Sequence, residues 1–314
     1  MRALRLRHVH GDKNGRKVPV LNSLASVLGI ENDLKQYGYT ISQAKDFERF
    51  YSDIYGQERL VPLRKTIEQK VFEYFLQLKL PNEVNLYDHL ILSLTQKDLI
   101  ISFNWDPFLL QAYLRNIDVG DLPQIVFPHG NVGMGLCNKC KLKGYYGYVC
   151  NSCFQEYQRS PLLFPVDQKN YNDISIIRNE WKLAKNYLQM TWGITIFGYS
   201  APETDIESIE LMKESFEQSR TKVYAPVTII NLPSEKQDQL TKWKEFYDDS
   251  NVLFCRAFEE TDLWRYPRIS LEAFFNAVLQ QDPKPDTFAF VGITSLAELQ
   301  KTAKSINTSF PLPE

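Results

Sequence analysis

The stretch that decides the fold runs from Leu99 to Cys153. It reads LIISFNWDPFLLQAYLRN at 99–116, QIVFPHGNVGMGL at 124–136 and CNKCKLKGYYGYVCNSC at 137–153. The apolar runs at 99–103 and 124–128 are short and rich in β-branched residues, which is typical of strands buried inside a parallel sheet. Each run ends in polar residues. Ligands of open α/β sheets bind at this carboxyl end of the strands, so these polar residues are candidates for a functional site.

Four cysteines in this stretch are spaced as metal ligands. They follow the pattern C-x2-C-x9-C-x2-C and comprise Cys137, Cys140, Cys150 and Cys153. Each C-x2-C turn can direct two thiolates at one ion, and four thiolates make a closed structural zinc site. Two disulfides or a redox pair are the alternatives. The first needs an oxidising compartment, for which we find no secretion signal, and two such pairs this close together favour a metal.

Three polar residues come after the two apolar runs and define the candidate catalytic site. Asn104 and Asp106 come after the first run, where Asn offers a donor and an acceptor to a ribose or an amide, and Asp offers a base or an orienting acceptor. The alternative is that Asp106, with the proline after it, caps the next helix. His129 ends the second run and precedes a glycine that lets the backbone turn, so it is placed as a general base near neutral pH.

The downstream sequence continues the alternation of strands and helices. We expect strands in ITIFGYS at 194–200, VTIINLP at 227–233 and NVLFCRAF at 251–258. An acidic helix should begin at Asp205, which is interpreted as its cap or as an acid of its first turn. Buried strands that alternate with helices predict an α/β fold with a doubly wound, mostly parallel sheet.

The order of these motifs resembles the sirtuin family, and in particular its divergent bacterial sirtuin-like domains. That family has an Asn-x-Asp after a strand, then a catalytic His-Gly, then two C-x2-C pairs that hold zinc. Further along, PLLFPVDQKN at 161–170 is similar to a weakened form of the family's apolar-Pro-Pro-x-x-x-Lys stretch. A strand ending in Gly-Tyr-Ser, an Asp a few residues later and a strand ending near an Asn complete the set. The similarity covers roughly residues 95–260.

The resemblance implies a Rossmann-like, sirtuin-type fold that binds NAD. In the family, the residues matching Gly198, Ser200 and Asn231 lie around the phosphates and the adenosine ribose of the cofactor. The resemblance places Asn104, Asp106 and His129 against the other ribose, with His129 as the base. It also implies a division of the chain into an N-terminal strand and helical subdomain (1–96), a sirtuin-like nucleotide-binding domain (97–281) with the zinc ribbon (135–158) inserted, and a C-terminal tail (282–314).

Two departures from the family pattern bear on activity. The glycine-rich turn that sirtuin-like domains use for the cofactor pyrophosphate is missing before residue 99, and KVPVLNSLASVLG at 17–29 resembles the segment that normally comes directly after that turn. The Phe-Gly-Glu that deacylases present to acyl-lysine is also absent. We therefore expect an NAD glycohydrolase rather than a protein deacylase. The alternatives are a catalytically inactive sirtuin-like scaffold or nucleotide sensor in a complex, and a zinc-ribbon protein that binds nucleic acid.

Composition limits the classes of partner. The chain has 314 residues and a formal net charge of −2, so it has no overall positive charge that would attract nucleic acid. Its apolar runs are too short to span a bilayer, and without a secretion signal we expect a soluble, cytoplasmic protein with Cys255 as a buried thiol. A protein partner or a homo-oligomer stays open. Members of the family's bacterial branch act in anti-phage defence, which we note as an association.

Overall fold

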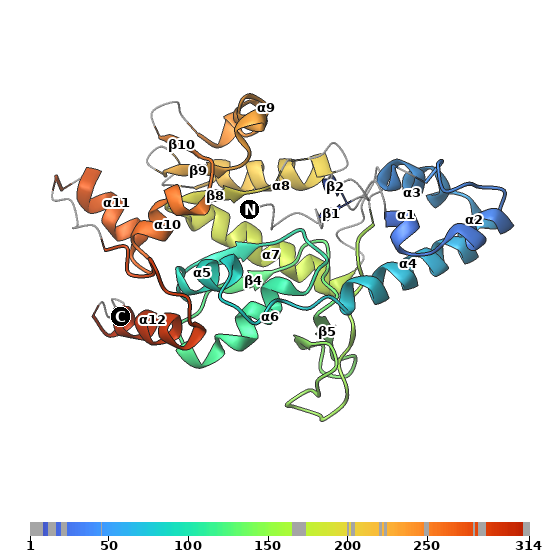
Figure 1. Cartoon of the computed structure of the whole chain (residues 1–314), viewed down its shortest axis with the longest axis horizontal. Coiled ribbons are helices and arrows are strands. Elements are labelled where there is room, and N and C mark those ends of the chain that lie inside the picture. Colours follow the sequence, from blue (N-terminus) through green and yellow to red (C-terminus); the bar gives the residue numbers. More distant parts are fainter. Residues whose placement is uncertain are drawn as a thin grey trace.

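The computed structural model describes residues 9–11, 17–19, 24–44, 46–164, 174–199, 201, 205–219, 222, 225–247, 251–278, 280–281 and 287–309. Its helices are α1 (Leu24–Val27), α2 (Glu31–Gln36), α3 (Phe47–Tyr55), α4 (Val61–Leu76), α5 (Leu86–Leu92), α6 (Phe108–Arg115), α7 (Ser175–Met190), α8 (Ile206–Glu217), α9 (Lys236–Lys242), α10 (Asp262–Arg265), α11 (Ser270–Val278) and α12 (Leu296–Ser309). Its strands are β1 (Val9–Gly11), β2 (Lys17–Pro19), β3 (Leu99–Ile101), β4 (Gln124–Val126), β5 (Met134–Leu136), β6 (Lys143–Tyr145), β7 (Gln158–Arg159), β8 (Ile194–Phe197), β9 (Val227–Ile230) and β10 (Val252–Cys255). Figure 1 shows their arrangement.

The segment that precedes β3 is helical, as its three-to-four apolar spacing predicts. Local signals fix the helix starts: the Asp46 side chain accepts from the Arg49 N–H at the start of α3, and Asn85 and Asp88 form a capping box on α5. Helices α1 to α4 bury their own apolar cluster and lie to one side of the sheet strands in Figure 1. Trp105 and Phe164 from the later chain pack into that cluster and join it to the rest of the molecule.

The predicted buried strands all form and pair in parallel. Strand β3 pairs with β4 in the register Ile100 opposite Ile125, and β9 pairs with β8 on one side and β10 on the other. In the described part of the chain these strands make two hydrogen-bonded groups, β3–β4 and β8–β9–β10. The stacked rings of Phe103 and Tyr199, whose centroids lie 4.9 Å apart, bring the carboxyl ends of the two groups together.

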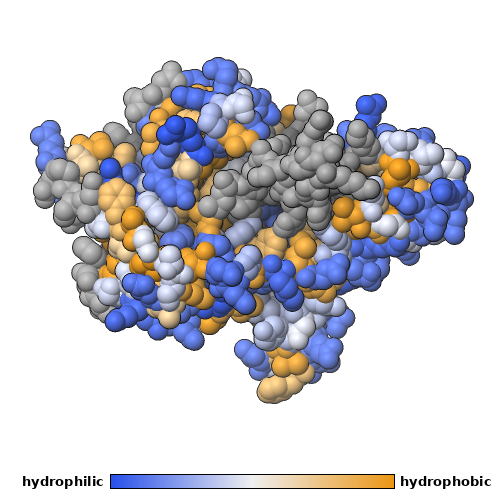
Figure 2. Space-filling view, in the orientation of Figure 1, coloured by the Kyte–Doolittle hydropathy of each residue, from blue (hydrophilic) through white to orange (hydrophobic). Residues whose placement is uncertain are grey.

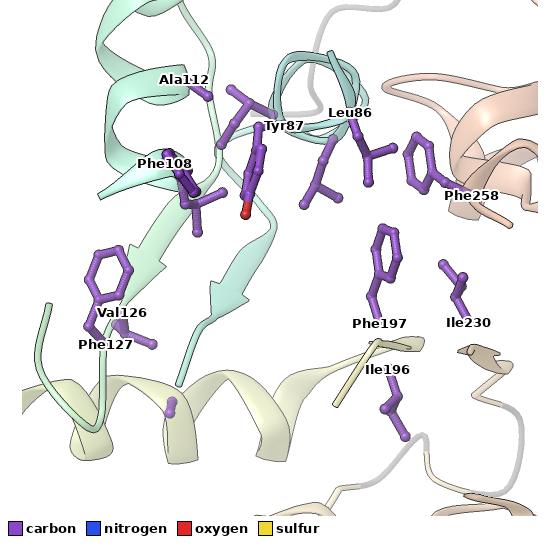
Figure 3. Packing of buried hydrophobic residues seen from close by; sticks show 14 of the residues in the cluster. Leu86, Tyr87, Phe108, Ala112, Val126, Phe127, Ile196, Phe197, Ile230 and Phe258 are labelled. Atoms are coloured by element: carbon purple, nitrogen blue, oxygen red, sulfur yellow. The ribbon is translucent and has the colours of Figure 1, made fainter. Parts of the chain in front are cut away.

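Helices pack against both sides of these strands, which is the layering of an α/β fold. Helix α7 contacts β3, β4 and α8, whereas α5 and α6 contribute Tyr87 and Phe108 to the core between the strand groups (Figure 3). The tail helix α12 docks on the same core through its fully buried Leu299 and Ala303. The predicted fold class is confirmed: parallel strands covered by helices, a helical N-terminal region and a four-cysteine hairpin.

The four-cysteine hairpin is a three-stranded antiparallel module of β5, β6 and β7. It projects from the body of the molecule, and apolar residues lie at its tip (Figures 1 and 2). At its base Gly135 and Gly144 face each other across the ladder, and the Tyr157 ring occupies the space that their side chains would need. None of the helices within the described residues combines the length and the apolar character that crossing a membrane requires.

Candidate functional site

The loop after β3 holds Asn104 and Asp106 between the two apolar clusters of the protein. Trp105 turns into the helical cluster, where its ring lies 4.7 Å from that of Phe164, centroid to centroid. Its two neighbours are also buried, with 9% of Asn104 and 3% of Asp106 exposed. The capping alternative also holds in part, since Asp106 Oδ1 accepts a 3.1 Å hydrogen bond from the Phe108 N–H at the start of α6.

Asn131, which no motif of the sequence indicates, ties this loop to the one after β4. Its Nδ2 donates to the carbonyl oxygens of Asp106 (2.6 Å) and Asn104 (3.1 Å), and its Oδ1 accepts from the Gly133 N–H (2.9 Å). The residue is fully buried. A buried amide with its donors and acceptor all used is a rigid spacer, so Asn131 fixes the distance between the two candidate loops.

Burial changes the acidity of Asp106. Removal from water raises the pKa of its carboxyl from 3.8 to about 7, and the hydrogen bond from the Phe108 N–H opposes this only in part. The nearby Tyr87 hydroxyl is also buried, and the Asp106 charge adds to the burial that raises the pKa of Tyr87. Asp106 therefore exchanges a proton near neutral pH, as a group that accepts or donates protons during a reaction must.

His129 lies on the turn that comes after β4. The backbone turns at Gly130, whose φ of +79° is a left-handed conformation that glycine adopts without strain, as the sequence predicts. A Cβ at this position would collide with the carbonyl oxygen of Pro161. The His129 carbonyl oxygen accepts from the Leu163 N–H at 2.9 Å, so the chain leaving the hairpin closes over the turn. The histidine is buried, with 5% of its surface exposed.

The imidazole of His129 faces the first turn of α8. Its Nε2 shares a 3.2 Å hydrogen bond with Ser208 Oγ and lies 3.9 Å from Asp205 Oδ1. Asp205 is the N-cap residue of α8, as expected, but its side chain makes no capping hydrogen bond, and its Oδ2 instead accepts from the Tyr199 hydroxyl at 3.0 Å. The Ser208 hydroxyl and the Asp205 carboxylate therefore both face Nε2 of the His129 ring.

The carboxyl ends of β8 and β9, in the second group of parallel strands, carry the candidate residues Gly198 and Asn231. Gly198 has a φ of +62° and open space where a side chain would lie, and its N–H donates to the Ile230 carbonyl oxygen at 2.9 Å. Asn231, directly after β9, is half-buried, and its Oδ1 accepts from the Leu232 N–H at 2.8 Å. Ser200 lies outside the described residues. The Tyr199 ring continues from Gly198 to stack on Phe103, which in turn lies edge-on to His129 at 4.8 Å.

The four-cysteine cluster has the geometry of a metal site. The four Sγ atoms lie within 4.8 Å of one another, and Cys137 and Cys153 Sγ are 3.4 Å apart. Sulfurs at about 2.3 Å from a tetrahedral zinc lie close to 4 Å from each other, so the donor set fits that ion. The Cys140 N–H donates to Cys137 Sγ at 3.3 Å, within the first C-x2-C turn. All five cysteines are free thiols, and Cys255 is buried away from the cluster, as predicted.

No protein-family model matches the chain, and no curated protein is similar to it in sequence. Among solved structures it is similar to Sir2 in complex with the inhibitor EX-527, 2′-O-acetyl-ADP-ribose and a deacetylated p53 peptide, with 15% identity over 71% of this chain and 81% of that chain and a TM-score of 0.32. It is also similar to a serine-to-alanine mutant of a Sir2 homologue bound to ADP-ribose, with 12% identity over 65% of this chain and 75% of that chain and a TM-score of 0.30. These structural neighbours are sirtuins. The likeness to them concerns the fold alone.

Proposed function

We propose that the chain binds NAD at the carboxyl ends of its parallel strands and hydrolyses the bond between nicotinamide and ribose. The observation that supports the proposal is that Asn104 and Asp106 after β3 and His129 after β4 are all buried at the carboxyl ends of two paired strands, in loops that Asn131 joins. The three residues come from the ends of two strands, and each belongs to a motif that the sequence alone marks as a candidate site. NAD is the ligand that their resemblance to sirtuin motifs implies.

The residues have complementary roles in this reaction. Breaking the bond from ribose C1′ to the nicotinamide nitrogen leaves positive charge on the ribose, which the Asp106 carboxylate and the Asn104 amide oxygen stabilise. Water adds to C1′, and His129 accepts its proton directly or through a ribose hydroxyl. The products are nicotinamide, ADP-ribose and one proton. The Asp205 carboxylate, 3.9 Å from His129 Nε2, balances the imidazolium charge until that proton is released.

Burial of the cluster supports hydrolysis over deacylation. Between 3% and 9% of the surface of each candidate residue is exposed, and the Leu163 N–H closes the His129 turn from the hairpin side. Water reaches such a site more readily than an acyl-lysine on a peptide, and the sequence lacks the Phe-Gly-Glu that deacylases present to that substrate. We assign the four cysteines to a structural zinc, because four thiolates leave no open position for a catalytic water.

The test is nicotinamide release from NAD by the zinc-loaded protein, measured by chromatography beside isothermal titration with NAD. We expect His129→Gln and Asn104→Ala to lower the release rate by at least about 100-fold. His89→Gln is the matched control, because His89 is also buried but packs against Trp264 on another part of the core. Its rate should stay near that of the wild type. NAD binding without release contradicts hydrolysis and favours the nucleotide-sensing scaffold, and the absence of binding contradicts both.

A role in anti-phage defence would result from NAD consumption, since depletion of NAD stops phage replication together with the growth of its host. We propose to measure NAD in infected cells that express the wild type or the His129→Gln variant. Depletion with the wild type alone supports defence, whereas equal NAD levels and equal plaque numbers contradict it.

A further inference from the structure

A buried carboxylate connects the four-cysteine hairpin to the strand that carries His129. Glu180 lies in the middle of α7 with 5% of its surface exposed. Its Oε2 accepts from the Phe127 N–H at 2.7 Å, two residues before His129. Both of its carboxylate oxygens also accept from Lys143 Nζ, at 3.0 and 2.8 Å. Glu180 therefore holds β4 and the hairpin at the same time.

Lys143 completes this link from the hairpin side. It lies three residues after Cys140, pairs with Leu136 across the β5–β6 ladder, and donates a third hydrogen bond to the Ile125 carbonyl oxygen at 2.9 Å. Its ammonium group also lies 5.7 Å from the centre of the Phe127 ring. The three donors of one ammonium are thus used on β4 and on the α7 residue that supports β4.

The other lysines of the hairpin do not share this arrangement. All three lysines are exposed, with 36% of the Lys143 side chain accessible to solvent, but within the described residues neither Lys139 nor Lys141 takes part in an ion pair or a side-chain hydrogen bond. Without Lys143, the Glu180 carboxylate would be left buried with the Phe127 N–H as its partner, which is unfavourable for a charged group. The end of β4 and the turn at 127–131 therefore depend on where the hairpin places Lys143.

We infer that Lys143 and Glu180 are positioning residues that couple metal binding in the four-cysteine site to the conformation of the His129 turn. A loaded site holds β6 in register and Lys143 on Glu180. Loss of the metal releases β6 and leaves the β4 end without its support. The coupling itself needs only these contacts, and its catalytic consequence rests on the proposed function.

Hydrogen–deuterium exchange of the peptide that spans 124–131 tests the coupling in the full chain. In the wild type, removal of the metal by a chelator should raise exchange in this peptide by at least about tenfold, because Glu180, the acceptor of the Phe127 N–H, loses the lysine that holds it in place. In Lys143→Met, exchange should be raised to that level with the metal bound and should not rise further on chelation. Lys141→Met, which removes a lysine of the same hairpin, should behave as the wild type. Elemental analysis should give one zinc per chain for each loaded protein.

One further variant and a kinetic measurement separate a specific link from general destabilisation. Lys143→Arg keeps a cation that can reach Glu180, and it should restore low exchange and full activity. For NAD release, Lys143→Met should lower kcat and leave KM near the wild-type value, since the link places a base rather than a binding group. Wild-type exchange in loaded Lys143→Met, or an equal rise on chelation in both proteins, overturns the inference. If the wild type releases no nicotinamide, the proposed function fails while the exchange comparison still decides whether the link exists.

Discussion

The raised pKa of Asp106 predicts how the stability of the protein depends on pH. Asp106→Asn keeps the shape of the side chain and an oxygen that accepts from the Phe108 N–H, but it removes the buried charge. In the native protein the carboxyl has a pKa of about 7, against 3.8 for an unperturbed Asp. The native state therefore binds more protons than the unfolded state between these pH values, so wild-type stability falls as pH rises through this window.

The size of the pKa shift of Asp106 sets how much stability changes with pH. Three units of pKa correspond to about 4 kcal/mol over the whole window, of which about 2 to 3 kcal/mol is lost between pH 5 and pH 8. Asn has no charge to lose. We expect the free energy of unfolding of Asp106→Asn minus that of the wild type to be larger at pH 8 than at pH 5 by that amount, so the variant gains stability relative to the wild type. Any effect of the substitution on the free energy of unfolding that does not depend on pH cancels in this difference.

Urea denaturation followed by circular dichroism at the two pH values measures this difference. Asp88→Asn is the matched control, because Asp88 is equally buried but forms an ion pair with Arg115 and accepts from Asn116 Nδ2 at 2.9 Å. It should lose stability at both pH values, since Arg115 loses its partner. A relative stability of Asp106→Asn that is unchanged between pH 5 and pH 8, or that moves in the opposite direction, would refute the reasoning. NAD release should fall in Asp106→Asn although the protein becomes more stable at pH 8.

Three further predictions concern the turn, the spacer and the metal. Gly130→Ala should lower the melting temperature strongly and reduce soluble yield, because its Cβ would collide with the Pro161 carbonyl oxygen at a φ of +79°; wild-type melting would contradict this. Asn131→Ala should cost about 2 to 3 kcal/mol in urea unfolding, because two carbonyl oxygens and one N–H lose buried partners; a cost below about 0.5 kcal/mol would show that the loops do not need it. Cys150→Ser should abolish stoichiometric zinc binding in elemental analysis, whereas Cys255→Ser should retain it, and equal zinc in both would refute the assignment.

The strands and the metal site were predictable because their signals are local in the sequence. Buried parallel strands need continuous apolar, β-branched runs, and the runs at 99–103 and 124–128 form β3 and β4 nearly where they were expected. The four cysteines need only their spacing. His129 and Gly130 were found for the same reason, since a strand end with a glycine directly after it is visible in the letters alone.

The partners of these residues depend on distances that the sequence does not contain. Ser208 and Asp205 reach His129 because α8 begins beside the turn, and the sequence marks Asp205 only as the start of the helix and not as a neighbour of His129. The sequence hints only weakly at the role of Asn131, as a polar residue directly after His-Gly in a buried segment. The hint for Glu180 is stronger: it lies on the apolar stripe of α7, four residues after Ile176 and next to Trp181, where a carboxylate requires a partner.

Histidine resonances in the NMR spectrum test most directly whether the carboxyl-end cluster is a nucleotide site. The chain has four histidines, so substitution of His89 and His129 assigns their imidazole signals. We predict that ADP-ribose shifts the His129 signals in a saturable manner and leaves those of His89 unchanged, because His89 lies against Trp264 and Phe290. The shift should be lost in Asn104→Ala. Unchanged His129 signals at saturating ADP-ribose and NAD would contradict the assignment of this cluster as the nucleotide-binding site.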